Sequence, residues 1–254
     1  MIFYFSGTGN TKWAAEQIAL STHDSLYYIP TELTGSCDYT LKEGESLGFC
    51  FPTHGWQPPR IVREFIRKAT FHSVSYVYAL TTCGDNMGHA MRILNKELAQ
   101  KGLKLDASFA VVMPESNVCF NFLHLDTPER KRQKITAAKE RMRHITAVIS
   151  SRQKGVEELV KGAIPYTYTY VIGGYYNKHL ITDRHFWVDE DACIACGLCQ
   201  KVCPVGDIEG TPPRWLHNDS CTNCLACYHH CPRHAIHWGK MKRGQYVFKD
   251  KEQH

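Results

Sequence analysis

The chain has 254 residues, of which 43% are hydrophobic, so it can bury a core in one or two domains. Its formal net charge of +5 is too modest to predict a nucleic-acid partner. No apolar run reaches the roughly 18 residues of a membrane helix, and the first residues lack the pattern of an export signal. Together with twelve cysteines, this predicts a protein of the reducing cytoplasm without membrane association.

The first predicted elements are a strand at 2–5, a loop at 6–11 and a helix at 12–20. The loop reads Ser-Gly-Thr-Gly-Asn-Thr. Its glycines let the backbone approach an anion and the helix N-terminus offers unpaired N–H groups, so the loop suits a phosphate. The spacing fits neither the G-x-G-x-x-G dinucleotide motif nor the P-loop. An ordinary capped turn is the alternative interpretation.

Strands and helices then alternate as far as residue 150. The predicted strands are 25–29, 46–51, 73–80 and 105–113, and the predicted helices are 61–69, 89–101 and 127–150. Residues 31–45 are expected to form a loop or a short stub. The alternation predicts an α/β domain, a doubly wound parallel sheet with helices on both faces. Polar loops at 52–59, 81–88 and 114–117 follow three strands, and ligands bind at this edge of such sheets.

The most specific motif lies between Cys193 and Pro232. The spacing C-x2-C-x2-C-x3-C-P occurs there twice, and the two runs start 28 positions apart. This is the spacing of bacterial iron–sulfur proteins, in which the fourth cysteine of each run binds the other cluster. Zinc sites use two separated pairs of ligands, and disulfides need an oxidising compartment, so both alternatives fit less well.

The spacing therefore predicts two [4Fe-4S] clusters. Cluster I is assigned to Cys193, Cys196, Cys199 and Cys231, and cluster II to Cys221, Cys224, Cys227 and Cys203. The repeat also predicts a pseudo-twofold α+β unit of two short hairpins and two short helices, with 186–188 and 236–238 as its terminal strands. A unit below about 70 residues has a marginal core, so we expect it to need metal in order to fold.

Residues 1–152 resemble a flavodoxin, through the loop at 6–11 and the loops after the later strands. Residues 185–238 resemble a bacterial two-cluster ferredoxin, and the whole chain is similar to a flavodoxin–ferredoxin fusion of anaerobic bacteria and archaea. The resemblance implies an FMN domain at 1–152 with a five-stranded sheet in the order 2-1-3-4-5. An aromatic-rich connecting segment at 153–184 would pack between the domains. A ferredoxin domain would follow at 185–254, with a charged tail along its surface.

The same resemblance assigns residues to FMN and none to catalysis. The phosphate would be held by Ser6, Gly7, Thr8, Gly9, Asn10 and Thr11. The first loop beside the flavin ring would comprise Pro52, Thr53, His54, Gly55 and Trp56, and the second Thr82, Cys83, Gly84, Asp85, Asn86 and Gly88.

Three of these residues have an ordinary structural alternative. Trp56 would stack on the ring or serve as a core residue. His54 would contact the flavin or stand exposed in its loop, and Cys83 is expected to be a packing residue. Phe120 and Phe122, in a later loop, would cover the ring or pad the fold.

FMN exchanges electrons singly or in pairs, whereas a four-iron cluster passes one at a time. We therefore expect electron transfer between low-potential one-electron carriers and FMN through the two clusters, with a ferredoxin or a reductase as partner. The alternative function is an FMN-dependent reductase of a quinone, nitro compound or disulfide. A redox sensor is a third, less favoured function. If flavin and clusters lie far apart within one chain, a homodimer would have to bring them together.

Overall fold

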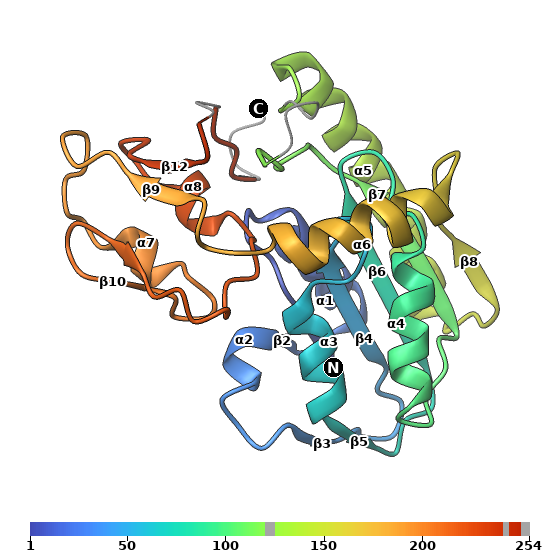
Figure 1. The fold of residues 1–254 in the computed structure, drawn as a ribbon. Coiled ribbons are helices and arrows are strands. Elements are labelled where there is room, and N and C mark those ends of the chain that lie inside the picture. Colours follow the sequence, from blue (N-terminus) through green and yellow to red (C-terminus); the bar gives the residue numbers. More distant parts are fainter. Residues whose placement is uncertain (120–124, 241–243, 250–254) are drawn as a thin grey trace.

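The computed structural model describes residues 1–119, 125–240 and 244–249 (Figure 1). Phe120 and Phe122, expected near the flavin ring, lie outside these residues. An α/β body forms the N-terminal part, a smaller region contains the eight clustered cysteines, and a helical segment joins the two (Figure 1). Among the described residues, no helix has the length and apolar character needed to cross a membrane.

The central sheet has six parallel strands in the order β2-β1-β4-β6-β7-β8. They are β1 (Ile2–Tyr4), β2 (Leu26–Tyr28), β4 (Leu47–Pro52), β6 (Val77–Cys83), β7 (Ala107–Val112) and β8 (Val156–Glu158). The inner strands are almost continuously apolar because helices cover both faces of the sheet. The chain passes from β2 on one side of β1 to β4 on the other. This reversal places the topological switch point at the carboxyl ends of β1 and β4.

The expectation of five strands is wrong by one. The first five follow the expected order 2-1-3-4-5, and β8 adds a sixth at the edge beside β7. This strand comes from the segment 153–184, which was expected only to connect the domains. Three residues are too few to show a periodic pattern, and the partner of β8 lies more than 40 positions away in the sequence.

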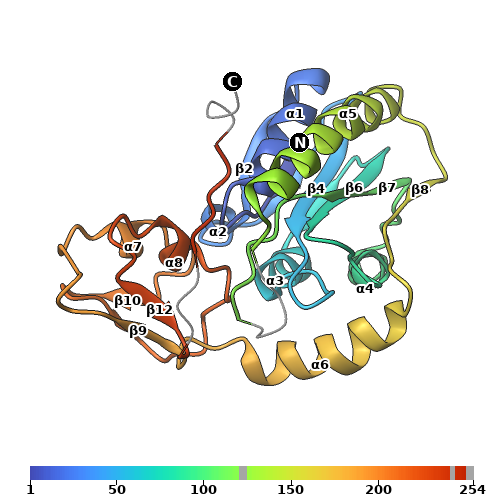
Figure 2. The same ribbon diagram turned by 90° about the horizontal axis from the view of Figure 1, so that it is seen from above.

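Two helices cover each face of the sheet (Figure 2). On one face α1 (Asn10–Thr22) packs beside α5 (Pro128–Ser150), and on the other α3 (Arg60–Lys68) packs beside α4 (Ala90–Ala99). Thr127 caps α5 by accepting a hydrogen bond from the Arg130 N–H, as its Thr-Pro start predicts. The segment 31–45 is the expected stub. It contains the end of α2 (Ile29–Glu32) and β3 (Asp38–Thr40), which pairs with β5 (Thr70–His72).

The cysteine-rich region has the predicted pseudo-twofold plan. β9 (Phe186–Val188) pairs antiparallel with β12 (Ile236–Trp238), which confirms the expected terminal strands. The second hairpin consists of β10 (Ile208–Glu209) and β11 (Arg214–Trp215). The short helices α7 (Leu198–Lys201) and α8 (Ala226–His230) lie within the first and second cysteine runs and pack together.

Residues 167–180 form one continuous helical run, which we call the connecting helix. It consists of η1 (Thr167–Ile172), α6 (Gly173–Tyr175) and η2 (Tyr176–Leu180), and it reaches from the α/β body to the cysteine-rich region (Figure 2). The Gln57 side-chain amide donates to the Thr169 carbonyl at 2.9 Å, and the Asn223 amide donates to the Tyr176 hydroxyl at 2.8 Å. The helix therefore contacts both parts of the protein.

The expected surface course of the tail is wrong for residues 244–249. The side chains of Tyr246 and Phe248 are only 8% and 9% exposed. The Phe248 ring lies 5.4 Å from that of Trp13 on α1, and its N–H donates to the Thr8 carbonyl at 2.8 Å. Burial of the two aromatic rings outweighs the charged character of the surrounding tail sequence.

Candidate functional site

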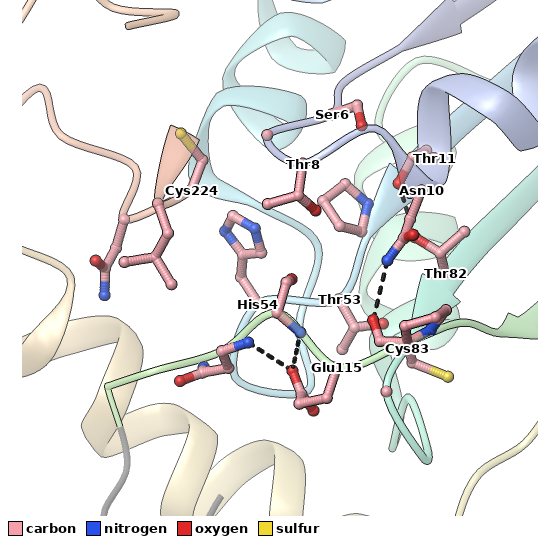
Figure 3. Close-up of a pocket in the computed structure, with 18 of the residues that line it drawn as sticks. Ser6, Thr8, Asn10, Thr11, Thr53, His54, Thr82, Cys83, Glu115 and Cys224 are labelled. Atoms are coloured by element: carbon pink, nitrogen blue, oxygen red, sulfur yellow. Dashed lines mark hydrogen bonds between the residues drawn. The ribbon is translucent and has the colours of Figure 1, made fainter. Parts of the chain in front are cut away.

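A cavity lies at the carboxyl edge of the sheet, at its switch point (Figure 3). Four loops of the α/β body line it, after β1, β4, β6 and β7. From these loops come Ser6, Gly7, Thr8, Asn10, Thr11, Pro52, Thr53, His54, Thr82, Cys83, Gly84, Pro114, Glu115, Ser116 and Asn117. The remaining wall comes from the connecting helix and from the second cysteine run, through Tyr176, Asn223, Cys224 and Leu225.

A second cavity of about 900 Å³ adjoins the first and shares five lining residues with it. Its own walls include Gly55 and Trp56 on one loop, Asp85 and Asn86 on another, and the connecting helix. The two cavities together contain all residues expected to contact FMN except Gly9 and Gly88. Three separate segments of sequence thus meet at one place, as expected for parallel strands whose carboxyl ends share an edge.

The loop at 6–11 is held by its own side chains. The Gly9 N–H donates to Ser6 Oγ at 3.1 Å, and Gly9 has the left-handed φ of 98° that starts α1. The Asn10 amide donates to the Pro114 carbonyl at 3.0 Å and its Oδ1 accepts from the Tyr246 hydroxyl at 2.7 Å. The hydroxyls of Thr11 and Thr82 lie 2.7 Å apart. These side chains fix the loop, so a phosphate would rely chiefly on backbone N–H groups and Thr8.

His54 is inside the site rather than in an exposed loop. Burial lowers its pKa to about 4, and a hydrogen bond with the Thr222 backbone opposes that shift only partly. The imidazole is therefore neutral near pH 7. Its Nδ1 is buried without a hydrogen-bond partner among the described residues, and so is Oδ1 of Asn86. Buried polar atoms without partners are costly, and their presence in the cavity walls indicates a polar ligand.

Trp56 and Cys83 take structural roles in the loops beside the second cavity. The Trp56 ring stacks on Tyr168 of the connecting helix, with centroids 5.2 Å apart and planes at 13°. Burial raises the pKa of Cys83 to about 12, so its thiol is protonated. Asp85 accepts a hydrogen bond from Arg130 at 2.8 Å, which ties its loop to α5.

Several lining residues were not predicted. Glu115 is a buried carboxyl whose pKa is raised by burial, and it accepts from the N–H groups of Ser116 and Asn117 at 2.8 and 2.7 Å. The polar loop at 114–117 after its strand was the available signal for these residues. Tyr176 and Asn223 had no local signal, because they reach the cavity only through packing between distant segments.

The four cysteines of cluster I surround one cavity of about 400 Å³. Cys193, Cys196, Cys199 and Cys231 all line it, among mostly apolar neighbours. The Ala235 N–H donates to the Cys231 sulfur at 3.3 Å. Cys231 of the second run thus lies beside the first three cysteines of the first run.

The cluster II cysteines lie close enough to perturb one another. Burial raises the pKa of Cys224 to about 11, and the negative charge of Cys203 adds to this rise. Burial also raises the pKa of Cys221 and Cys227, and Cys203 and Cys224 contribute to both shifts. Buried thiols of this kind become favourable as thiolates when metal supplies positive charge.

Each set has four cysteines, the number of thiolates that a four-iron cluster binds. Among the described residues, no group of three or more His, Cys, Asp or Glu side chains could hold one metal ion. In a four-iron cluster each thiolate binds a different iron, so the sulfurs stand apart. Backbone N–H groups also point at sulfurs of cluster II, from Asn223 to Cys221 at 3.4 Å and from Asp207 to Cys203 at 3.3 Å.

Comparison with protein families gives a match over residues 185–232, to the 4Fe-4S dicluster domain. Residues 185–232 form a 4Fe-4S dicluster domain. It contains all eight cysteines of the two runs and holds two [4Fe-4S] clusters, which implies electron transfer. No curated protein matches the chain.

The dicluster domain meets the sheet edge through its cluster II loop. Cys224 lines the cavity beside the loop at 6–11 (Figure 3). A Cβ atom added to Gly7 would lie 2.4 Å from the Cys224 carbonyl oxygen, so only glycine permits this approach. The His54 ring also touches this loop, through the backbone of Thr222. One chain therefore brings cluster II against the candidate ligand cavity.

Proposed function

We propose that the two adjoining cavities bind FMN and that the protein transfers electrons between FMN and its dicluster domain. The observation that carries this proposal is that Cys224 lines the same cavity as the loop at 6–11. FMN supplies one- and two-electron chemistry, whereas each cluster supplies one-electron chemistry. The protein would thus convert between the two kinds of carrier.

Three observations support FMN as the ligand. The cavity lies at the switch point of a parallel sheet, where such folds bind nucleotides. The loop at 6–11 runs into the N-terminus of α1, a favourable position for a phosphate. The buried, unpartnered His54 Nδ1 and Asn86 Oδ1 would gain partners from a polar ring system. These features accompany the resemblance of residues 1–152 to flavodoxins.

The geometry favours a fixed order of cofactors within one chain. Cluster II would be the neighbour of FMN, because Cys224 lies in the cavity wall. Cluster I would be the entry point for an external ferredoxin or reductase, because Cys196 and Ile194 are exposed. A homodimer is then not required for transfer.

Anaerobic purification followed by assay of iron, sulfide and flavin tests the cofactor content. Roughly eight irons and one FMN per chain are expected from two four-iron clusters and one flavin site. Replacing Thr8 by aspartate should expel FMN, because a carboxylate would face the phosphate, while the iron content stays unchanged. Thr8→Val, which has the same shape, is the matched control and should keep most of the flavin. Iron without flavin in the wild-type protein would refute the proposal.

The cofactor order is tested with one ligand variant of each cluster. Cys196→Ser and Cys224→Ser should each retain about half of the iron, since each removes one ligand of one cluster. The EPR signal of the cluster left in Cys196→Ser should change when FMN is removed. The signal of the cluster left in Cys224→Ser, which is cluster I, should not change when FMN is removed. The reverse pattern would contradict the proposed order.

A further inference from the structure

A separate groove of about 1300 Å³ lies between α3 and α4 and shares no lining residue with the two cavities of the candidate flavin site. Four basic side chains line it, in pairs spaced one helical turn apart. Arg63 and Arg67 come from α3, and Arg92 and Lys96 from α4. Residues four apart lie on one helix face, so the two helices turn their positive charges toward each other.

Among the described residues that line the groove, Glu97 is the only carboxylate beside these four cations. Glu97 is 6% exposed and receives hydrogen bonds from Arg63 at 2.8 and 2.9 Å and from Arg67 at 2.5 and 2.8 Å. Hydrogen bonding from Arg67 and Arg63 lowers the pKa of Glu97 despite its burial, so it is ionised near pH 7. The groove retains an excess of three positive charges, and Arg92 and Lys96 form no ion pair with any other residue that the structure describes.

The buried carboxylate also preorganises the arginines. Each guanidinium donates from Nε and Nη2 to Glu97, which leaves both Nη1 N–H groups and the second Nη2 N–H for another acceptor. A guanidinium held in this way binds a phosphate with two parallel hydrogen bonds and loses little side-chain entropy.

An aromatic ring and several amides complete the lining. Tyr170 of the connecting helix is 38% exposed at the groove, beside the side chains of Gln57, Asn95 and Gln100. Its neighbour Thr169 is tied to the residues that precede both helices. The Thr169 carbonyl accepts from Gln57 at 2.9 Å, and its hydroxyl accepts from the His89 N–H at 2.8 Å. Tyr170 is therefore held over the groove, where the connecting helix crosses α3 and α4 (Figure 2).

We propose that this groove binds a nucleotide, with its phosphates at the arginines and lysine and its base on Tyr170. The two cations of each helix lie about 6 Å apart along the helix axis, a spacing that neighbouring phosphates of a diphosphate can span. Charge-assisted bonds to phosphate would supply affinity, and the aromatic ring with its neighbouring amides would select a base. The site is distinct from the proposed flavin site and does not depend on it.

The test measures binding of ADP, pyrophosphate and adenosine to the cofactor-loaded protein by isothermal titration calorimetry. ADP should bind most tightly and adenosine most weakly. Pyrophosphate should bind with intermediate affinity, because it contacts only the cations. The double variant Arg92→Ala/Lys96→Ala spares the bonds to Glu97 and should weaken ADP binding roughly tenfold or more. The double variant Arg132→Ala/Arg143→Ala removes the same charge from exposed positions on α5 and should bind ADP as the wild type does.

Three results would overturn the proposal. The first would be that the wild-type protein does not bind ADP at millimolar concentration. The second would be that the two double variants bind ADP equally well. The third would be that the wild-type protein does not bind ADP and that Arg92→Ala/Lys96→Ala no longer accepts electrons from a reduced ferredoxin. The groove would then be a protein-docking surface. Iron content and melting temperature verify that each variant is folded and loaded. Tyr170→Ala should weaken binding of ADP more than that of pyrophosphate.

Discussion

The side-chain amide of Asn223 donates a hydrogen bond of 2.8 Å to the hydroxyl of Tyr176. Asn223 lies between two ligands of cluster II, and Tyr176 belongs to the connecting helix. Both are buried, and both line the cavity proposed for FMN. The next residue, Asn177, donates to the carbonyl of His54 at 3.2 Å. The connecting helix thus fixes the cluster II loop and the loop after β4 in one arrangement.

Replacing Tyr176 by phenylalanine should lower the free energy of unfolding by roughly 1–3 kcal/mol, because the buried Asn223 amide loses the shorter of its two hydrogen bonds and keeps only the one to Cys119. It should also slow electron transfer between cluster II and FMN, since the loops lose a common anchor. Urea denaturation and stopped-flow reduction measure the two effects. Tyr175→Phe, at a position 61% exposed on the same helix, is the control and should change neither. A Tyr176→Phe protein with wild-type stability and rate would show that the bond is dispensable.

Gly7→Ala should disturb the contact between the two parts of the protein. The new Cβ would lie 2.4 Å from the Cys224 carbonyl oxygen, so the backbone of the cluster II loop must move. Overpacking of this kind costs roughly 1–3 kcal/mol. We expect a lower melting temperature and a slower reduction of FMN.

Gly174→Ala supplies the matched control for Gly7→Ala. An added Cβ at Gly174, in α6, meets no atom within 4 Å, and its φ is not left-handed. Alanine in a helix is favoured over glycine by up to about 1 kcal/mol, so this variant should be as stable as the wild type or more stable. Equal effects of the two substitutions would contradict the close approach at Gly7.

His54 should make the protein less stable in mild acid. Its folded pKa is lowered to about 4, whereas an unfolded histidine titrates near 6.5. The unfolded chain therefore binds more protons between these values, so stability is lost as the pH falls from about 6.5 toward 4. His54→Asn should reduce the stability difference between pH 7 and pH 5 by roughly 1–2 kcal/mol. Denaturant unfolding at the two pH values measures it.

The control for the pH effect is His23→Asn. His23 is exposed at the end of α1 with a φ of 59°, a conformation that asparagine tolerates. This variant should keep the wild-type dependence on pH. A His54→Asn protein with unchanged pH dependence would mean that the imidazole is not buried in solution.

Iron removal should unfold the dicluster domain while the sheet of the α/β body persists. The domain has only short strands and helices around its cysteines, so its stability depends on metal. Limited proteolysis after anaerobic chelation should cut within 185–238 and spare 1–119. Native-like thermal unfolding of the dicluster domain without iron would disprove this dependence.

The sequence was informative wherever spacing along the chain determines the chemistry. The cysteine runs predicted the dicluster domain and its terminal strands, and the Gly-rich loop with the alternating elements predicted the sheet edge that forms the site. β8 escaped prediction because three residues carry no periodic signal. The roles of Tyr176, Asn223 and Tyr246 also escaped prediction. Each depends on packing between segments far apart in the sequence, and no local propensity encodes such contacts.

The contact of Tyr246 and Phe248 with the loop at 6–11 also constrains the order of biosynthesis. Asn10 and its partner Tyr246 are separated by 236 positions, and all eight cluster cysteines lie between them. During translation, the loop at 6–11 can form its contacts with Tyr246 and Phe248 only after the iron-binding segment has left the ribosome. We therefore expect the proposed flavin site to mature last, after cluster insertion has ordered the region that carries Tyr246. A cell starved of iron would then accumulate chains defective at both cofactor sites.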